Sequence, residues 1–226
     1  MMQKRSVRLG DYDTASDGLW TLAALDFQEP ELETNLVPIP GRTRGPLDLS
    51  YVLTEGEPCY GSRSLSITLE SSEGDRAARQ MRISNMINRL HGRRVDIVLP
   101  DHPQHYATGR LSVKQSYNDL AHAAVEVSAT CEPWLYSAKE TQVVLQATSS
   151  EQVAHLTNSG AMTVVPVLEV TAEAGQNILL KYGTASGSFS AGIYSWPTLW
   201  LTPGEHEVTY SGAGIMTIKY REAVLR

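Results

Sequence analysis

The chain has 226 residues, of which 42% are hydrophobic and 19% are charged, and its formal net charge is −6. This length allows one large β domain or two smaller domains, and the apolar content is sufficient for a sizeable core. The acidic balance argues against a general binder of nucleic acid or another polyanion, which would normally be basic.

Strand patterns dominate residues 1–136. In "SRSLSITLES", Leu65, Ile67 and Leu69 alternate with polar residues, and this period of two is typical of a strand with one buried face. The stretches "RRVDIVLP", "YATGRLSVKQSY" and "AHAAVEVSATCEPW" continue the pattern, and "NDL" predicts a turn between the last two. We therefore expect an antiparallel sheet in the first part of the chain.

A helix is predicted from about residue 75 to residue 91, inside this run of strands. Its apolar stripe has the spacing i, i+3, i+4 and i+7 and consists of Ile83, Met86, Ile87 and Leu90. Asp75 is the expected N-cap, and Gly92 is the expected C-terminal stop. We expect the helix to pack on an antiparallel sheet that folds into a barrel.

Residues 137–226 contain fewer charges, and strand patterns recur there about every 10 residues with Gly and Pro between them. The candidate strands are "TQVVLQA", "VVPVLEVTA", "NILLKYG", "GSFSAGIY", "TLWLT", "HEVTYSG" and "GIMTIKYREAVL". They predict a small β-sandwich without a second helix. We place the domain boundary near Tyr136, with residues 137–150 as a crossing strand or linker.

The cysteines and the apolar runs indicate the compartment. Cys59 and Cys131 are too few for a disulfide framework, and we expect both to be buried, reduced thiols. Residues 1–20 lack the apolar run of a secretion signal, and no stretch approaches the roughly 20 apolar residues of a membrane helix. We expect a soluble protein, made in a reducing cytoplasm, without a membrane partner.

The stretch "NLVPIPGRTRGPLDLSYVL", residues 35–53, raises the question of a phosphate-binding loop. Such a loop needs a strand, a glycine-rich turn and then the N-terminus of a helix. Here the strand-like "LDLSYVL" follows the glycines, and Pro46 removes an amide donor. This excludes a phosphate loop, and it leaves Arg42 and Arg44 as solvated charges or as partners of acids on another chain.

Two histidines in "PDHPQHY", His102 and His105, raise the question of a metal or catalytic site. A metal site needs further ligands, which no Cys or His cluster supplies, and a hairpin turn explains the prolines and the aspartate. Asp101 with either histidine could form part of a catalytic triad, but no serine lies in a G-x-S-x-G elbow. We therefore expect no cofactor, no metal and no enzymatic activity, with a hydrolase as one alternative.

Two further groups of side chains have open interpretations. The basic flank of the predicted helix faces either solvent or an acidic neighbouring subunit, and it consists of Arg82, Arg89 and Arg93. Acidic partners are available in "QEPELET", namely Glu29, Glu31 and Glu33.

The second domain is rich in aromatic residues: Tyr182, Phe189, Tyr194, Trp196, Trp200, Tyr210 and Tyr220. These are either core residues or a sugar-stacking surface, so a carbohydrate-binding module of a surface protein is a second alternative.

The order of these signals resembles the siphophage distal tail protein family. The glycine-rich stretch matches the family's Pro–Gly and Gly–x–Leu–Asp motif at Pro40, Gly41, Gly45, Leu47 and Asp48, although Pro46 departs from the pattern. After the helix come a hairpin with Tyr106, Gly109 and Arg110 and a strand that ends in Cys131, Pro133 and Trp134. The second half resembles the family at Asn158, Gly160, Pro166, Pro203 and Gly204.

This resemblance implies a structural virion protein. It implies that residues 1–136 form a tail-tube-like β-barrel that closes a homo-hexameric ring, and that residues 137–226 form a galectin-like β-sandwich. The ring would join the tail tube protein to the tail tip or hub protein and the receptor-binding machinery, with the tape measure protein as a further candidate partner. The protein would be assembled in the host cytoplasm and would reside in the virion tail.

The resemblance also suggests roles for particular residues. The candidates for the subunit contact or the lumen are Arg42, Arg44, Arg82, Arg89 and Arg93. The glycine-rich stretch would be a structured loop that leads into a barrel strand. No direct recognition of nucleic acid is implied, and a cell-surface saccharide is a candidate ligand of the sandwich.

Overall fold

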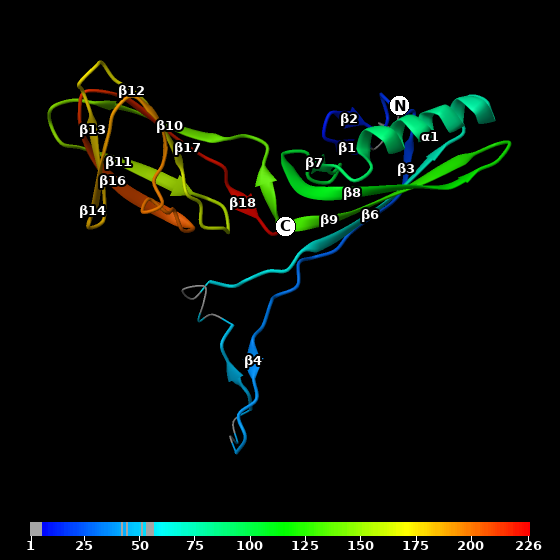
Figure 1. Cartoon of the computed structure of the whole chain (residues 1–226), viewed down its shortest axis with the longest axis horizontal. Helices are drawn as coiled ribbons and strands as arrows, with labels where there is room; N and C mark the ends of the chain where they lie inside the picture. Colours follow the sequence, from blue (N-terminus) through cyan, green and yellow to red (C-terminus); the bar gives the residue numbers. More distant parts are fainter. Residues whose placement is uncertain (1–5, 42, 44, 51, 53–56) are drawn as a thin grey trace. The chain divides into compact units, whose positions relative to one another are not determined.

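In the computed structural model, the chain divides into two compact units. Unit 1 comprises Met1–Leu135 together with Leu225–Arg226, and unit 2 comprises Tyr136–Val224 (Figure 1). The structure describes residues 6–41, 43, 45–50, 52 and 57–226. Arg42 and Arg44 therefore lie outside the described residues. The last two residues, which we assigned to the second domain, belong to unit 1.

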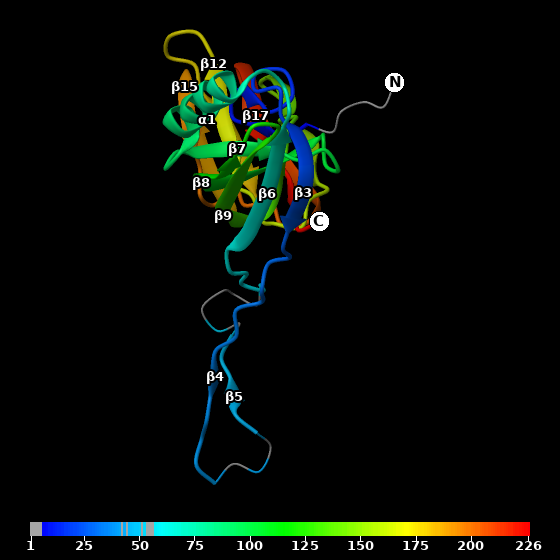
Figure 2. The ribbon, with the colours of Figure 1, turned by 90° about the vertical axis from the view of Figure 1, so that its right-hand side faces the viewer.

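Unit 1 contains a curled, half-barrel sheet with the strand order β2-β1-β7-β8-β9-β6-β3 (Figure 2). Its strands are β1 (Arg8–Leu9), β2 (Tyr12–Asp13), β3 (Thr21–Phe27), β6 (Arg63–Ser71), β7 (Arg94–Val98), β8 (His105–Asn118) and β9 (Ala123–Ser137). Strands β6 and β9 pair antiparallel, from Arg63 opposite Cys131 to Ser71 opposite Ala123. The expected mostly β fold with an antiparallel sheet is confirmed.

The alternation of apolar residues explains which face of this sheet is buried. Leu65, Ile67 and Leu69 of β6 are almost completely buried, and so are Val125 and Val127 on the neighbouring strand β9. Burying such a side chain contributes about 1.5–3 kcal/mol relative to leaving it exposed. The polar residues between them point to the other face, so the period of two fixes both the strand type and the buried side.

Helix α1 (Arg76–Leu90) begins and ends where the sequence predicts. The Asp75 carboxylate accepts a hydrogen bond of 2.7 Å from the Ala78 amide, and Gly92 follows the helix with a φ of +77°. Ile83, Met86 and Leu90 are buried, and the helix packs against β8. The left-handed conformation at Gly92 ends the helix at little cost because glycine has no Cβ.

The glycine-rich stretch forms a separate two-stranded sheet of β4 (Leu36–Val37) and β5 (Leu47–Asp48). Gly41 and Gly45 have φ angles of +81° and +82°, which few other residues adopt, and they lie in the turn between the two strands. The expectation that this stretch leads into a barrel strand was therefore wrong. The turn brings the chain back on itself, so that Leu47 pairs with Val37.

Unit 2 is a β-sandwich of two four-stranded sheets, with the orders β10-β17-β12-β15 and β11-β16-β13-β14. Its strands are β10 (Thr141–Ala147), β11 (Gln152–Asn158), β12 (Val167–Thr171), β13 (Ile178–Tyr182), β14 (Ala185–Phe189), β15 (Gly192–Ser195), β16 (Gly204–Gly212) and β17 (Gly214–Tyr220), whereas the short β18 (Ala223–Val224) pairs with β9. Its core includes Leu156, Leu168, Leu180 and Val208. The predicted sandwich is confirmed.

Two details of the sandwich differ from the sequence pattern. Strand β11 was not predicted, because its "QVAHLTN" has a weak alternation in which only Leu156 is a large buried apolar residue. The segment "TLWLT" was predicted as a strand but forms a single bridge between Val164 and Leu201. Leu199 and Leu201 are both fully buried, so core packing rather than strand pairing explains the apolar residues there.

The sandwich is expected to fold without unit 1 and to need β10 for its full stability. A fragment of residues 136–224 should unfold in one cooperative thermal transition, since domains with their own core usually fold alone. A fragment of residues 151–226 loses Leu145 and Ala147 from the core, and it should be less stable by at least about 2 kcal/mol. Equal stability of the two fragments in thermal denaturation would show that β10 is dispensable.

Candidate subunit interface

The connection between β3 and β6, residues 28–62, is named the arm. Backbone hydrogen bonds join its two sides: Glu33 N donates to Cys59 O at 2.8 Å, and Gly61 N donates to Glu31 O at 2.8 Å. Further along lie β4 and β5, which Figure 2 shows side by side and which pair only with each other among the described residues. The arm is therefore a narrow two-stranded ribbon.

The motif residue Asp48 stabilises the arm locally. Its carboxylate accepts hydrogen bonds from the amide and the hydroxyl of Ser50, and the Ser50 hydroxyl in turn accepts one of 2.8 Å from the Asn35 amide. The bonds from Ser50, chiefly that from its hydroxyl, lower the pKa of the Asp48 carboxyl. The charged carboxylate thus ties the two sides of the ribbon together close to β4 and β5.

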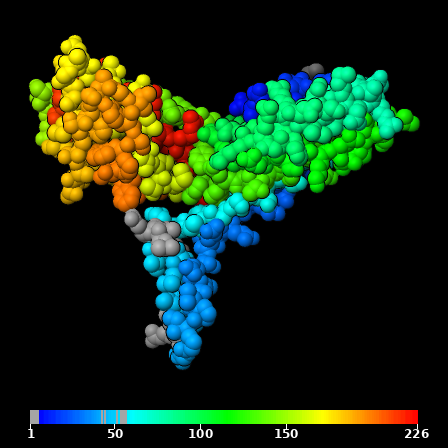
Figure 3. All heavy atoms as spheres, viewed as in Figure 1, coloured from blue at the N-terminus to red at the C-terminus, as the bar shows by residue number. Residues whose placement is uncertain are grey.

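Among the described residues, the arm exposes apolar side chains, and Figure 3 shows the arm, in blue and cyan, extending away from the half-barrel. All residues from 31 to 41, including the motif residues Pro40 and Gly41, are exposed. The exposed apolar residues are Leu32 (47%), Leu36 (52%), Val37 (38%), Ile39 (44%) and Val52 (66%). An isolated two-stranded hairpin is marginally stable in water, and clustered exposed apolar residues mark interaction sites. The arm is therefore the candidate subunit interface.

The base of the arm is held by a buried arginine, Arg63, of which only 3% is exposed. Its guanidinium donates to three carbonyl oxygens: Gln28 O at 2.7 Å, Leu225 O at 2.7 Å and Pro133 O at 3.3 Å. It also lies 3.9 Å from the centre of the Phe27 ring. Burial lowers the pKa of the Arg63 side chain, and these contacts compensate for part of the lost hydration.

This arrangement explains two of the motif residues. Pro133 supplies one carbonyl to Arg63, and the neighbouring Trp134 packs edge-on against Tyr60 with ring centres 5.6 Å apart. Tyr60 lies on the returning side of the arm, just before β6. The end of β9 therefore fixes the place where the arm leaves the sheet.

Gly109 is required by close packing between β8 and β9. A Cβ at this position would lie 2.6 Å from the Cys131 sulfur and 3.1 Å from the Thr130 carbonyl oxygen. Cys131 is a buried free thiol whose pKa is raised to about 11 by burial, whereas the free thiol of Cys59 is half-buried. Tyr106, another motif residue, lies near the start of β8 and is half-buried.

Gly109→Ala is expected to destabilise unit 1 by about 1–3 kcal/mol, because the added methyl group overpacks a closely filled site. A Cys131→Ala background removes the nearest obstacle, the sulfur, so the same substitution should cost less there. Denaturant unfolding of the single and double variants measures the difference. Equal costs in both backgrounds would show that the Cys131 sulfur is not the obstacle.

The arginines of the helix flank are engaged within unit 1. Arg82 donates to the Ser71 hydroxyl at 3.3 Å and to the Glu73 carbonyl, and Arg89 forms an ion pair of 2.8 Å with Asp11. Arg89 lowers the pKa of the Asp11 carboxyl. Arg93 is exposed. Two of these arginines thus stabilise their own chain, and a subunit contact or lumen role for the set stays a prediction.

The acidic stretch of the arm base has other neighbours than the helix flank. Glu29 pairs with Arg226 at 2.8 Å, and the Glu33 carboxylate accepts a hydrogen bond of 3.5 Å from the Cys59 thiol. The described contacts therefore do not join this stretch to the arginines of α1 within one chain.

Two of the residues considered for hydrolysis, Asp101 and His102, lie at a polar hollow of about 200 Å³. It is lined by Leu25, Phe27, Glu29, Arg63, Leu99, Asp101, His102 and Arg226. A hydrolase needs a nucleophile within hydrogen-bond reach of its base, and this lining contains no Ser, Thr or Cys. His105 begins β8 and does not line the hollow. The geometry gives the hydrolase alternative no support.

Most aromatic residues of unit 2 belong to its core. Phe189, Tyr210 and Tyr220 are buried, and Tyr182, Tyr194 and Trp196 pack against the same cluster. Only Trp200, with 46% of its surface exposed, is an exposed aromatic among the seven. A sugar-stacking surface usually needs more than one exposed ring, so this arrangement does not favour the carbohydrate-binding alternative.

The described ranges contain neither a candidate metal site nor a helix that could span a membrane. No group of three or more His, Cys, Asp or Glu side chains there could hold a metal ion. Likewise, α1 is too short and too polar to cross a bilayer, and the described part of the chain has no other helix.

The half-barrel with one helix, followed by a sandwich, is a fold that this chain shares with a solved phage protein. One solved structure with this fold is Dit (gp 19.1) of SPP1, described as a paradigm of the hub adsorption apparatus in phages that infect Gram-positive bacteria. The TM-score is 0.68 at 14% sequence identity, and the match covers 98% of this chain and 99% of that chain. The resemblance to distal tail proteins is thereby confirmed at the level of the fold. The chain matches no protein-family model, and no curated protein matches it.

Proposed function

We propose that this protein is a structural component of a long-tailed phage virion and forms a hexameric ring at the distal end of the tail. The observation that carries the proposal is the fold shared with SPP1 Dit, because the match spans both units and nearly the full length of both chains. A single shared domain would support only a fold class, whereas the same two domains in the same order support the same kind of assembly.

The surfaces of unit 1 support a ring. Strands β2 and β3 end the described sheet, and unpaired edges are normally covered in assembled proteins. The exposed apolar arm offers a second surface that a neighbouring copy can bury. Repeating one head-to-tail contact around an axis closes a ring without free ends. In this proposal the arm and the sheet edges of unit 1 form the contact.

The proposed partners follow from the position at the end of a tail. The ring joins the tail tube protein to the tail tip or hub protein and the receptor-binding machinery, with the tape measure protein as a further neighbour. The sandwich is a docking or scaffolding domain. The protein acts by binding and positioning other proteins, and it has no catalytic role.

Native mass spectrometry over a range of protein concentrations tests the proposal. The expected species at high concentration has six times the chain mass of 24.8 kDa. A stable ring of five or seven chains would contradict the hexameric ring. Hydrolysis of a peptide, ester or glycan that disappears in Asp101→Asn or His105→Ala would contradict the absence of a catalytic role.

A further inference from the structure

Strand β10 lies at an edge of the sandwich and lacks the usual protection of an edge strand. It pairs with β17 along its whole length, from Thr141 opposite Tyr220 to Ala147 opposite Gly214. On its other side, no described strand pairs with it. Its sequence, "TQVVLQA", contains no charged residue and no proline, the devices by which natural proteins prevent edge-to-edge association. This edge is therefore suited to pair with another strand.

The side chains of β10 alternate cleanly between the two faces of the sheet. Leu145 is buried in the core and Val143 packs against it, while Gln142, Val144 and Gln146 face outward. Val144 is 64% exposed although it lies in the middle of the strand. The outer face of the same sheet carries three more exposed β-branched residues: Val167 (42%), Ile193 (74%) and Ile215 (44%). An added strand with the same alternation of apolar and polar residues would extend both the core-facing side and the outer side of this sheet.

The centre of β10 has the same order of polar and apolar residues from either end: Gln142, Val143, Val144, Leu145 and Gln146. In an antiparallel pair centred on Val144, each glutamine faces the other glutamine, Val143 faces Leu145, and Val144 faces Val144. In this register, core-facing residues lie opposite core-facing residues and outward residues lie opposite outward residues. A shift by one residue would place core-facing residues opposite outward ones. We propose that β10 pairs with β10 of a second copy in this register, which makes one continuous eight-stranded sheet.

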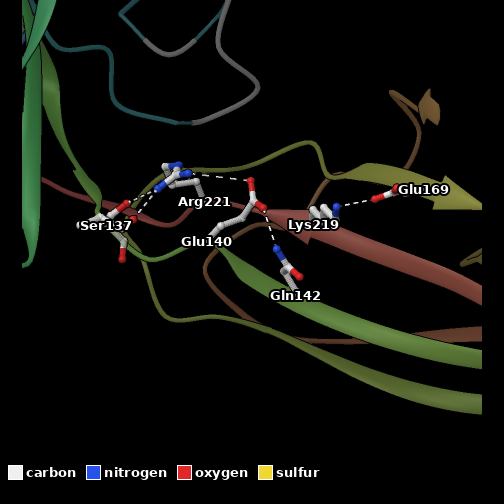
Figure 4. A network of polar contacts seen from close by, with 7 residues as sticks. Ser137, Glu140, Gln142, Glu169, Lys219 and Arg221 are labelled. Carbon is white, nitrogen blue, oxygen red and sulfur yellow. Dashed lines mark hydrogen bonds and ion pairs between the residues drawn. The ribbon is translucent and has the colours of Figure 1, made fainter. Parts of the chain in front are cut away.

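The charges near this edge do not oppose the pairing. Figure 4 shows Lys219 paired with Glu169 on the outer face, and Glu140 between Gln142 and Arg221 just before β10. The Glu140 carboxylate accepts a hydrogen bond of 3.0 Å from Nε2 of the Gln142 side chain, and Arg221 donates to Ser137 O at 2.7 Å. Lys219 and Arg221 thus each have an acidic partner within the chain, and residues 142–146 themselves carry no charge.

This contact is different from the contact of the proposed ring. Neighbours in a sixfold cyclic ring are related by a 60° rotation, whereas the β10 pair requires a twofold axis. The β10 pair therefore joins two unassembled chains or two rings, and it does not depend on the ring for its existence. The occupant of the edge is a second copy of this chain.

A cysteine at position 144 tests the pairing. Antiparallel neighbours have Cα atoms about 4.5–5.5 Å apart, and disulfides span Cα separations of about 4.4–6.8 Å. In a Cys59→Ser background, Val144→Cys should form a covalent dimer under mild oxidation. The matched control is Ile193→Cys, which is more exposed, lies on the same outer face and belongs to the opposite edge strand β15. It should form at least tenfold less dimer.

The same experiment has clear contrary outcomes. No cross-link at position 144, or an equal cross-link at position 193, would overturn the proposal. Val144→Lys places two positive charges opposite each other in the proposed dimer. Sedimentation equilibrium should show that this variant dimerises at least tenfold more weakly. Its unfolding midpoint should be unchanged, because the side chain at position 144 is exposed in the single chain. A dimer unaffected by Val144→Lys would also overturn it. Because the ring-contact variant Leu36→Ser/Val37→Ser leaves β10 intact, a cross-link in that background separates this proposal from the ring.

Discussion

Arg63→Ala is expected to lower the free energy of unfolding of unit 1 by about 3–5 kcal/mol, because it removes three hydrogen bonds from a charged donor, each of which typically contributes about 1.5–3 kcal/mol. The substitution leaves the carbonyls of Gln28, Pro133 and Leu225 without their shared donor and removes the contact with the Phe27 ring. Denaturant unfolding measures the loss. The base of the arm and the C-terminal residues should also exchange amide hydrogens faster, since Arg63 joins them.

The matched control for this prediction is Arg226→Ala. The Arg226 side chain is 82% exposed and pairs only with the exposed Glu29 in the described contacts, so its removal should change stability by less than about 1 kcal/mol. If the two variants lost similar stability, the buried position of Arg63 would not be the reason for its importance, and the account of the arm base would fail.

Leu36→Ser/Val37→Ser is expected to abolish the ring while leaving the fold unchanged. Both side chains are exposed on the arm, so the unfolding midpoint of the isolated chain should stay the same. In the proposed ring, a neighbouring copy buries both side chains, and burial of one such residue contributes about 1.5 kcal/mol or more. Replacing both residues therefore weakens each contact between neighbouring subunits by about 3 kcal/mol. That loss weakens every contact by about 100-fold. Native mass spectrometry should then detect no hexamer at concentrations where the unchanged protein forms it.

Val153→Ser is the matched control for the arm. Val153 is 53% exposed, close to the 52% of Leu36, but it lies on β11 of the sandwich. This variant should assemble like the unchanged protein. A hexamer that persists in the arm variant, or one that is lost equally in the control, would place the ring contact elsewhere.

The regular elements could be predicted because their signals are local. Asp75, the stripe from Ile83 to Leu90 and Gly92 all lie within a few turns of one helix, and α1 occupies that segment. The alternation at Leu65, Ile67 and Leu69 likewise fixed β6 and its buried face. The order of the glycine, helix and hairpin motifs then pointed to the fold that the comparison confirms.

The roles of the buried arginines and the course of the arm could not be predicted, because they depend on residues far apart in the sequence. Arg63 meets Leu225 across 162 positions, and Arg79, which is 1% exposed, donates to the carbonyls of Asp119 and Leu120 about 40 positions away. In sequence, both look like ordinary surface charges. The arm was mistaken for a loop before a barrel strand, since "LDLSYVL" has a strand pattern whether its partner is the sheet or the other side of a hairpin.

Electron cryomicroscopy of assembled tails tests the central proposal most directly. The account predicts a ring of six copies of this chain at the distal end of the tail, with the half-barrels of unit 1 forming the closed ring and the arm of each copy lying against its neighbour. A ring of another symmetry, or tails whose distal end lacks this chain, would contradict it.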